Sequence, residues 1–244
     1  SWGSLEKIKD VFLIPESLQE QFRKSEIMES PKEKMRHSSC RARAAHWVTQ
    51  FVGLSLSFTA VTASADYEDG VNAAFAGDYD TAFREFSLAA QQGLDLAQYN
   101  LAILYFTGQG VDQDYGQAFR WTKAAAAQGH INAQANLASL YLEGTGVVRD
   151  VDQAVSWFSA AGLSGHASAA MTLTVMYRDG EPIGQDFVQA HAWAQVARRE
   201  AHPESEKVLS DLEASMSREQ LRSARRLFAR WQIEPVKLPW PPEQ

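Results

Sequence analysis

The residue types that could carry chemistry in this sequence are few, and most of them fall at repeated positions. His130 and His166 stand 36 residues apart, at equivalent points of a repeating pattern. Equivalent residues of stacked repeats are separated by a whole structural unit, whereas the ligands of one metal ion lie about 2 Å from it. His191 and His202 have no neighbours at ligand spacing. We therefore expect no metal site.

Motifs for nucleophilic and acid–base catalysis are equally sparse. Residues 4–7 read Ser-Leu-Glu-Lys, which fits the Ser-x-x-Lys pattern of penicillin-reactive enzymes without any accompanying motif. No P-loop or dinucleotide-binding fingerprint is present, so we expect no cofactor. Most acidic residues stand at repeated positions just before a helical pattern, where they cap helix ends. The sequence therefore predicts no catalytic residues and a protein that is not an enzyme.

The charge balance argues against one large class of partner. The 244 residues include 23 Lys and Arg against 30 Asp and Glu, a formal net charge of −7. Nucleic-acid binding needs a concentrated positive face that displaces counterions from phosphates, so we expect no nucleic-acid partner. With 45% hydrophobic residues the chain can bury a core. Its single cysteine, Cys40, excludes an internal disulfide.

The first 65 residues have the pattern of a segment that is processed rather than folded. A basic segment from Met35 precedes an uncharged stretch that ends in Ala63-Ser64-Ala65. This order predicts a signal peptide at 35–65 that is cut before Asp66. Residues 1–34 are then an upstream extension that does not belong to the native fold.

Cleavage would place the protein outside the cytoplasm. Residues 66–244 contain no cysteine and carry a net charge of −9, which suits an oxidising compartment. We expect a periplasmic or secreted protein with no stable membrane insertion once the signal is removed. The alternative is an uncleaved anchor, because the uncharged run approaches the roughly 20 residues that span a bilayer. The repeats would still face outward, since flanking basic residues stay inside.

The remainder of the chain repeats itself every 36 residues. Residues 94–129 and 130–165 agree at 17 of 36 positions, where ordinary composition would give roughly two. Residues 166–201 form a more divergent third repeat, and residues 66–93 supply a preceding half-unit. Such a period predicts a solenoid, in which each unit buries its apolar faces against its neighbours.

Each unit has two amphipathic helical patterns around a glycine turn. Apolar or small residues recur at i, i+3 or i+4 and i+7 in both halves. Two glycines after the first helix, Gly108 and Gly110 in the first repeat, can take the positive φ of a tight reversal. The side chains expected to fill the gap between units are Trp121, Trp157 and Trp193, and the acids expected to cap the second helices are Asp114, Asp150 and Asp186.

This pattern resembles the Sel-one-like repeat, a 36-residue relative of the tetratricopeptide repeat. The first unit matches A-x-x-N-L-A-x-L-Y-x-x-G-x-G-V-x-x-D-x-x-x-A-x-x-W from Ala97 to Trp121. The resemblance implies an all-α fold, a right-handed α-solenoid of helix-turn-helix repeats over residues 66–201. The third unit departs from the pattern with Thr172 for Asn and Pro182 for the second Gly, so its turn should be stiffer.

Two further helical patterns follow the repeats. Pro203 can start one helix, and residues 217–220 form a capping box for a second. Because a solenoid must cover its terminal apolar face, we interpret residues 202–232 as capping helices and the proline-rich residues 233–244 as an extended tail. The last helix carries a basic stripe that is either a solvated face or a docking site for an acidic partner; it consists of Arg222, Arg225, Arg226 and Arg230.

The first helix of each unit lines the concave side in repeat proteins of this kind. Its non-core positions recur at i, i+3 or i+4 and so share a face. We predict that Asn100 and Asn136 bond the backbone of an extended peptide; the alternative is that both bond a neighbouring helix. The residues predicted to bind a partner are Tyr99, Asn100, Ile103, Phe106, Asn136, Ser139, Leu142 and Arg178, with Met171 and Val175 beside them.

The resemblance implies an exported scaffold for protein–protein interaction, an adaptor or regulator of an envelope process with a protein or peptide as its partner. The alternative is a secreted hydrolase that acts on cell-wall material or β-lactams, since some secreted repeat relatives have been called β-lactamase-like. Those relatives are cysteine-rich, whereas residues 66–244 have no cysteine. Turnover of nitrocefin by the purified protein would distinguish the two functions.

Overall fold

The chain is helical throughout the part that its structure describes. The structure is a computed structural model that describes residues 58–233, with side chains from Tyr67 onward. No strand occurs in this range, so the prediction of an all-α fold is confirmed. The helices are α3 (Phe58–Ala76), α4 (Tyr79–Gln91), α5 (Asp95–Thr107), α6 (Tyr115–Ala127), α7 (Ile131–Glu143), α8 (Val151–Leu163), α9 (Ala167–Asp179), α10 (Phe187–Arg199), α11 (Ser205–Ser215) and α12 (Arg218–Ile233).

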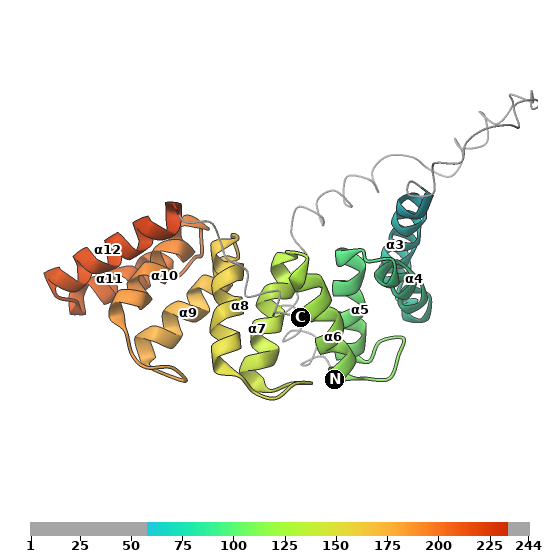
Figure 1. The fold of residues 1–244 in the computed structure, drawn as a ribbon, viewed down its shortest axis with the longest axis horizontal. Coiled ribbons are helices and arrows are strands. Elements are labelled where there is room, and N and C mark those ends of the chain that lie inside the picture. Colours follow the sequence, from blue (N-terminus) through green and yellow to red (C-terminus); the bar gives the residue numbers. More distant parts are fainter. Residues whose placement is uncertain (1–57, 234–244) are drawn as a thin grey trace, which may run out of the picture. The chain divides into compact units, whose positions relative to one another are not determined.

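The helices follow one another in chain order, as Figure 1 shows. The first helices of the three repeats, α5, α7 and α9, are termed the A helices, and α4, α6, α8 and α10 the B helices. Each A helix packs on the B helix before it and on the B helix after it. Its remaining side therefore faces away from the B helices.

Three core positions recur in the A helices at intervals of 36 residues. They are held by Ala97, Leu101 and Leu104, by Ala133, Leu137 and Leu140, and by Ala169, Leu173 and Met176, and all nine side chains are buried. In α11 the next interval brings Ser205, Leu209 and Leu212, which are also buried. α11 is therefore the first helix of a fourth, incomplete repeat as well as part of the cap.

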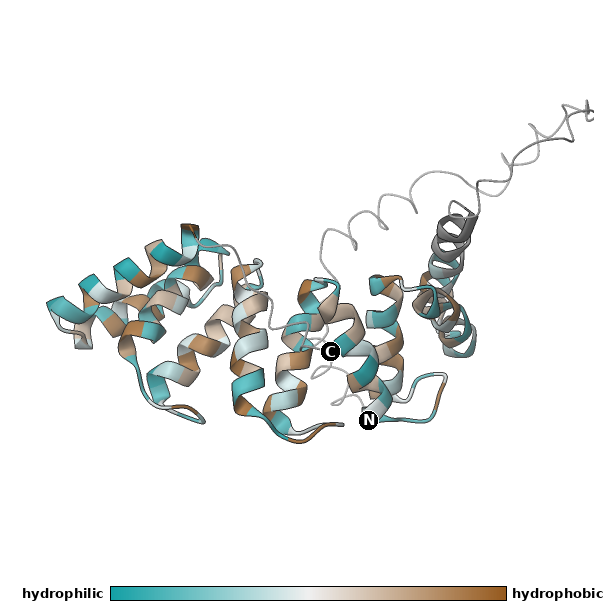
Figure 2. Cartoon of the chain, viewed as in Figure 1, coloured by the Kyte–Doolittle hydropathy of each residue, from teal (hydrophilic) through white to brown (hydrophobic). Residues whose placement is uncertain are grey.

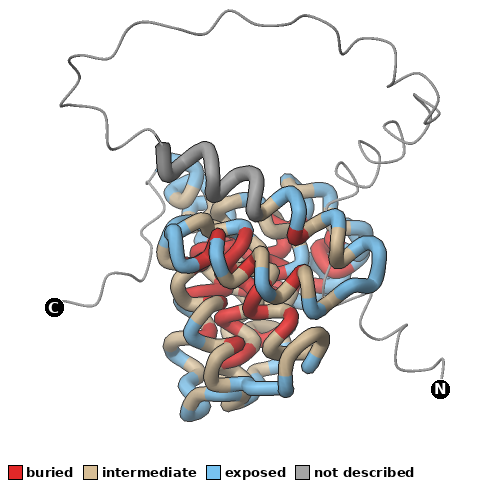
Figure 3. The backbone as a smooth tube through the Cα atoms, turned by 90° about the vertical axis from the view of Figure 1, so that its right-hand side faces the viewer, coloured by how far each residue is buried: buried red, intermediate tan, exposed pale blue. Residues whose placement is uncertain are grey.

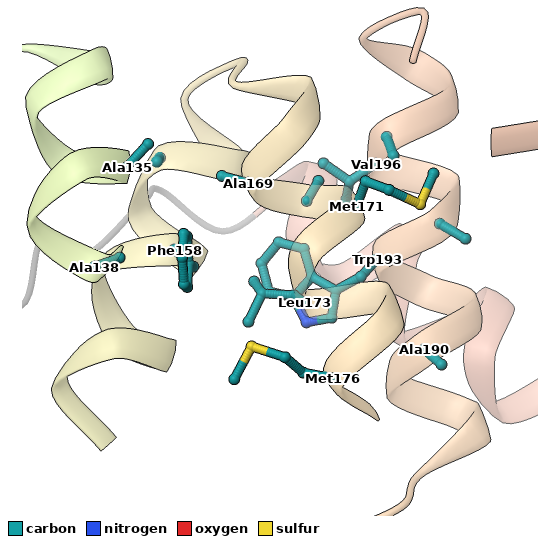
Figure 4. Packing of buried hydrophobic residues seen from close by; sticks show 14 of the residues in the cluster. Ala135, Ala138, Phe158, Ala169, Met171, Leu173, Met176, Ala190, Trp193 and Val196 are labelled. Carbon is teal, nitrogen blue, oxygen red and sulfur yellow. The ribbon is translucent and has the colours of Figure 1, made fainter. Parts of the chain in front are cut away.

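Buried residues gather in the interior of the helix stack, and exposed residues lie on its outside (Figure 3). Trp157 and Trp193 are buried as predicted. Trp121 is only half-buried, because it lies at the margin of the smaller core cluster around Phe86. Figure 4 shows Trp193 of α10 among the core side chains of α9. Its ring also lies 4.4 Å, between centroids, from that of Trp231, so α12 covers α10.

The predicted aspartate caps form in all three repeats. The Oδ1 atoms of Asp114, Asp150 and Asp186 accept a hydrogen bond from the backbone N–H three residues later, at 2.9, 3.0 and 3.0 Å. Each cap satisfies a donor that the first turn of a helix otherwise leaves unpaired. The repeated acids therefore start the B helices.

The second glycine of the turn sets how closely successive repeats approach. A Cβ atom on Gly110 would overlap the carbonyl group of Tyr79, and one on Gly146 would overlap that of Tyr115. Tyr79 and Tyr115 are the first residues of the preceding B helices. Both glycines also have positive φ, 67° and 71°. Only glycine meets both conditions without strain.

Two further helix caps come from histidine. His130 Nδ1 accepts a hydrogen bond from Ala133 N at 3.2 Å, and His166 Nδ1 accepts one from Ala169 N at 3.1 Å. A ring nitrogen that accepts a hydrogen bond carries no proton. Burial lowers the pKa of both histidines below the usual 6.5. The two histidines therefore recur because each caps an A helix in its neutral form.

One buried hydrogen bond of the first repeat is missing from the second. Gln98 Nε2 donates to a carbonyl of α4 at 3.3 Å, and its Oε1 accepts from Gln128 Nε2 at 2.8 Å. The equivalent Gln134 donates to α6 at 3.4 Å in the same way. However, its buried Oε1 has no partner in the described part of the chain. Ser164 stands where Gln128 supplies the donor, and its side chain is too short.

The boundaries of the first and last helices differ from the prediction. The half-unit was expected to begin at residue 66, but its first helix, α3, begins at Phe58, since no glycine or proline interrupts residues 58–69. The predicted cleavage position before Asp66 therefore lies within α3. α12 ends at Ile233, which was assigned to the tail. The extension at 1–34, the signal sequence up to residue 57 and the tail from 234 lie outside the described residues.

Replacing Ser164 by Gln should stabilise the protein. Ser164 and Gln128 have nearly the same backbone angles, φ −84° with ψ 4° and 0°, so the new side chain can reach Gln134 Oε1. One satisfied buried acceptor contributes about 1 kcal/mol to the free energy of unfolding, or about 2–4 °C in Tm. Ser164→Glu is the matched control, because it has the same length but no N–H donor. Equal Tm values for the two variants would contradict this account.

Stability should fall as the pH drops below 6.5, the usual histidine pKa. The unfolded histidines then bind protons that the folded caps exclude, so the unfolded state holds more protons and the free energy of unfolding decreases. The decrease continues until the pH reaches the lowered pKa of the folded state. Denaturant titrations across this range should show a weaker pH dependence for His130→Asn/His166→Asn, since asparagine caps helices without titrating. An unchanged pH dependence would exclude these histidines as its source.

Candidate partner-binding surface

The predicted binding residues occupy equivalent places on the A helices. Ile103 and Ser139 share one repeat position, and Phe106, Leu142 and Arg178 share another. All five are half-buried. Residues 103 and 139 each follow a buried leucine by two positions, which places them on the opposite side of a helix of 3.6 residues per turn. They therefore lie on the side that the B helices leave open.

Both predicted asparagines lie at the junction of successive first helices. Asn100 Nδ2 donates a hydrogen bond to Tyr67 Oη at 3.2 Å, and Asn136 Nδ2 donates to Tyr99 Oη at 3.5 Å. This is the bond to a neighbouring helix that the sequence left open as the alternative. Neither amide oxygen is among the buried atoms that lack a partner. Since no hydrogen bond to either Oδ1 occurs among the described residues, both atoms keep some solvent exposure.

Tyr99 also has a structural role that the sequence did not predict. Its ring stacks on that of His130, with 4.5 Å between centroids and 24° between planes. Burial raises the pKa of Tyr99 to about 12. The ring thus holds the capping histidine of α7 against α5. A substitution at Tyr99 would disturb the fold together with the surface.

The tyrosine–asparagine bond is not repeated between α7 and α9. Ala135 and Thr172 stand at the corresponding positions, and Thr172 Oγ1 donates to Ser168 O within α9 at 2.9 Å. Met171, predicted to lie beside the open face, is instead buried. Its long side chain belongs to the core cluster that also contains Val196 of α10 (Figure 4).

Two exposed apolar side chains lie on this side, of which Val175 was predicted and Leu96 was not. Leu96 is 41% exposed and Val175 is 37% exposed. Leu96 lies one turn before Asn100, so the same i, i+4 spacing could have identified it. The open side of the A helices, with its edge, is termed the A-helix face and comprises Leu96, Asn100, Ile103, Phe106, Asn136, Ser139, Leu142, Val175 and Arg178. Phe106 and Leu142 form the edge, since the ring of Phe106 packs edge-on against that of Tyr115 of α6, at 5.2 Å between centroids, and Leu142 packs in part against the core.

The A-helix face carries little net charge. Arg178 donates to both carboxylate oxygens of Asp179, at 2.7 and 3.1 Å. This hydrogen bonding lowers the pKa of Asp179 and raises that of Arg178, so both groups stay ionised. Their charges offset each other next to the apolar residues. The face therefore suits an uncharged or mixed surface better than a polyanion.

Two kinds of feature are absent from residues 67–233 as the structure describes them. No group of three or more His, Cys, Asp or Glu in this range is arranged to hold a metal ion. No described helix combines the length and the apolar character needed to cross a membrane. Residues 4–7, with the Ser-x-x-Lys pattern, lie outside the described residues, so their chemistry stays a prediction.

Three consecutive stretches of the chain match the family model of the Sel1 repeat. They are residues 95–130, 131–166 and 168–202. Each stretch contains one A helix and the B helix that follows it. Its limits fall within two residues of those predicted from the 36-residue period.

Solved structures of repeat proteins are similar to this chain. One is a Sel1 repeat protein from Oxalobacter formigenes, with a TM-score of 0.55, 26% identity and 59% of each chain covered. Another is c5321, a protective antigen present in uropathogenic Escherichia coli strains and displaying an SLR fold, with a TM-score of 0.61 and 26% identity over 74% of this chain and 40% of that one. The chain thus spans less than two thirds of either relative. No curated protein sequence matches it. Residues 95–202 thus match three consecutive Sel1 repeats, and the chain is similar to Sel1 repeat proteins.

Proposed function

We propose that this protein is a scaffold that binds a protein or peptide partner on its A-helix face. The observation that carries the proposal is the presence of apolar side chains on the open side of three successive A helices. Leu96 and Val175 are exposed, and Ile103 and Leu142 are half-buried. Aligned apolar side chains at a surface are typical of binding sites.

The A-helix face is suited to an extended or helical segment that crosses the repeats. Its side chains are held by packed helices, so most of the ordering cost on binding falls on the ligand. The partly exposed Oδ1 atoms of Asn100 and Asn136 can accept hydrogen bonds from backbone N–H groups of such a segment. Apolar contacts would supply affinity, and the two amides would fix its direction.

Export to the periplasm or the cell exterior is the second part of this proposal, with a role as adaptor or regulator of an envelope process. It is supported by the order of basic, uncharged and Ala-x-Ala segments before Asp66. Among the α3 side chains that the structure describes, Tyr67, Val71, Ala73 and Ala74 pack against the core cluster, and they follow this position. Cleavage would therefore leave those contacts in place.

Two glutamates on the A-helix face should abolish partner capture. Ile103→Glu/Val175→Glu adds charges at equivalent positions of α5 and α9, where binding would have to desolvate them. In pull-downs from extracts of the producing cells, the partner recovered with the wild-type chain should fall by about tenfold or more.

A matched control adds the same two charges on the B helices. Leu88→Glu/Ser156→Glu changes exposed residues of α4 and α8, and it should capture the partner as the wild type does. Circular dichroism melts of both variants would verify the fold. Equal loss of capture in the two variants would show that the A-helix face is not the binding site.

The mature protein should begin at Asp66. N-terminal sequencing of protein recovered from the periplasm or medium should start at Asp66, because the signal peptidase cuts after Ala65. Replacing Ala63 and Ala65 by Leu should leave the uncleaved form in the cell extract. Recovery of the native protein with residues 35–65 attached would contradict export by cleavage and favour the membrane-anchor alternative.

A further inference from the structure

The charge of the described chain is segregated between α12 and the helices before it. Residues 67–217 contain 8 Lys and Arg and 19 Asp and Glu, whereas residues 218–233 contain 5 Arg and 1 Glu. The net charges are therefore −11 and +4. Figure 2 shows strongly hydrophilic segments along α12. A cationic helix at the end of an acidic solenoid is the largest charge contrast in this part of the molecule.

α12 is anchored by its apolar side, which fixes the direction of its arginines. Ala224 is fully buried, and Leu221, Phe228 and Trp231 pack against the core. The capping box of residues 217–220 forms as predicted, with hydrogen bonds of 2.8 and 3.2 Å. All five arginines of the helix are exposed. The opposite side of α12 is thus a rigid basic face.

Four of these arginines take part in no ion pair within residues 67–233: Arg218, Arg222, Arg225 and Arg226. By contrast, Arg178, Arg198 and Arg199 each lie within 4 Å of a carboxylate. The four α12 arginines, termed the arginine face, leave their guanidinium donors available.

Helix stability does not explain this pattern. Arg218, Arg222 and Arg226 follow one another at i, i+4 spacing, which places like charges side by side. Arg218 also stands in the first turn, where the helix dipole disfavours a positive charge. Both effects oppose folding of α12. The pattern is instead what recognition of carboxylates requires, since each guanidinium can bind a carboxylate with two parallel hydrogen bonds.

We propose that the arginine face binds an acidic segment of a protein partner, separately from the A-helix face. Arg218 and Arg226 are about 12 Å apart along the helix axis, which fits a helical segment with carboxylates at i, i+4 spacing. This surface is independent of the function proposed above, because it lies on a different helix. Either surface can fail its test while the other stands.

A compact acidic segment fits better than an extended polyanion. α11 packs on α10, as α12 does, and carries Glu206, Asp211 and Glu213. A nucleic acid or an anionic membrane would extend past the arginine face onto the other helices, whose net charge of −11 would repel it. A short segment can end before it reaches them.

The test uses the full chain and a fluorescein-labelled, alanine-rich peptide of about 12 residues with four glutamates at i, i+4, i+7 and i+8. Fluorescence anisotropy at low ionic strength should show binding that weakens with salt. A peptide with Gln in place of Glu should not bind. Arg222→Gln/Arg226→Gln should lower the affinity by about fivefold to tenfold, and Arg222→Lys/Arg226→Lys should lower it less.

The matched control is Arg84→Gln/Arg120→Gln, which removes the same charge from exposed positions of α4 and α6. It should keep the wild-type affinity within about twofold. Equal losses in the two Gln variants would overturn the proposal, because binding would then follow net charge alone. Absence of binding to the Glu peptide would also overturn it.

Two further measurements test whether a different ligand binds the arginine face. The chain could instead bind single-stranded DNA of about 12 nucleotides, or phosphatidylserine vesicles, more strongly than it binds the Glu peptide. If Arg222→Gln/Arg226→Gln abolished that stronger binding, the acidic-segment proposal would be overturned. A dimer of the wild-type chain in light scattering, absent in that variant, would show that a second copy occupies the face and would overturn it equally. Circular dichroism melts would verify that each variant is folded.

Discussion

The arrangement of this protein depends on how closely each repeat can approach the next. The repeats meet through alanines that are fully buried at equivalent places in the B helices, Ala125, Ala161 and Ala197. Gly110 and Gly146 lie against the carbonyl groups that begin the preceding B helices. Small residues at these points let backbones touch, so the larger side chains of the A helices interlock in a fixed register. A larger residue at one of these points would shift neighbouring repeats and so alter the surfaces that their helices form together.

The fixed register between repeats explains why helix caps and turn glycines recur in each repeat and why some side-chain hydrogen bonds do not. Asp caps, His caps and left-handed glycines return every 36 residues because each serves the same helix end. The Gln98–Gln128 bond and the Tyr99–Asn136 bond need two residues from different helices. When one residue of such a pair is replaced, the other loses its hydrogen-bond partner, as Gln134 has. α11 keeps the register for one more helix, and α12 then covers α10, which ends the stack.

The parts of the fold that depend on short-range pattern could be predicted from the sequence. Helix number in the repeats, the aspartate caps and the capping box of residues 217–220 all follow from spacings within one unit. For Asn100 and Asn136 the sequence left open a bond to a neighbouring helix but could not identify the tyrosine partners, because the bonds span 33 residues in one case and 37 in the other. Met171 was placed on the wrong side because a methionine gives no signal that separates core from surface. The packing of α12 on α10 depends on Trp193 and Trp231, whose proximity no sequence spacing indicates.

Two surfaces of different character result from this framework. The A-helix face is apolar, nearly neutral and fixed by the packing of A helices between B helices. The arginine face is cationic and lies at the end of the stack, whereas the helices before α12 carry a net negative charge. Binding at the A-helix face would be driven by apolar burial and resist salt, whereas binding at the arginine face would weaken with salt. A scaffold with both could hold two different segments at once.

The central claim is that the open side of the A helices contacts a partner. The most direct measurement is photo-crosslinking in the producing cells, with a benzophenone amino acid placed either at Ile103 of α5 or at Leu88 of α4. The account predicts a defined adduct of one partner protein from position 103 and none from position 88. An adduct from position 88 alone, or the same adduct from both positions, would contradict it.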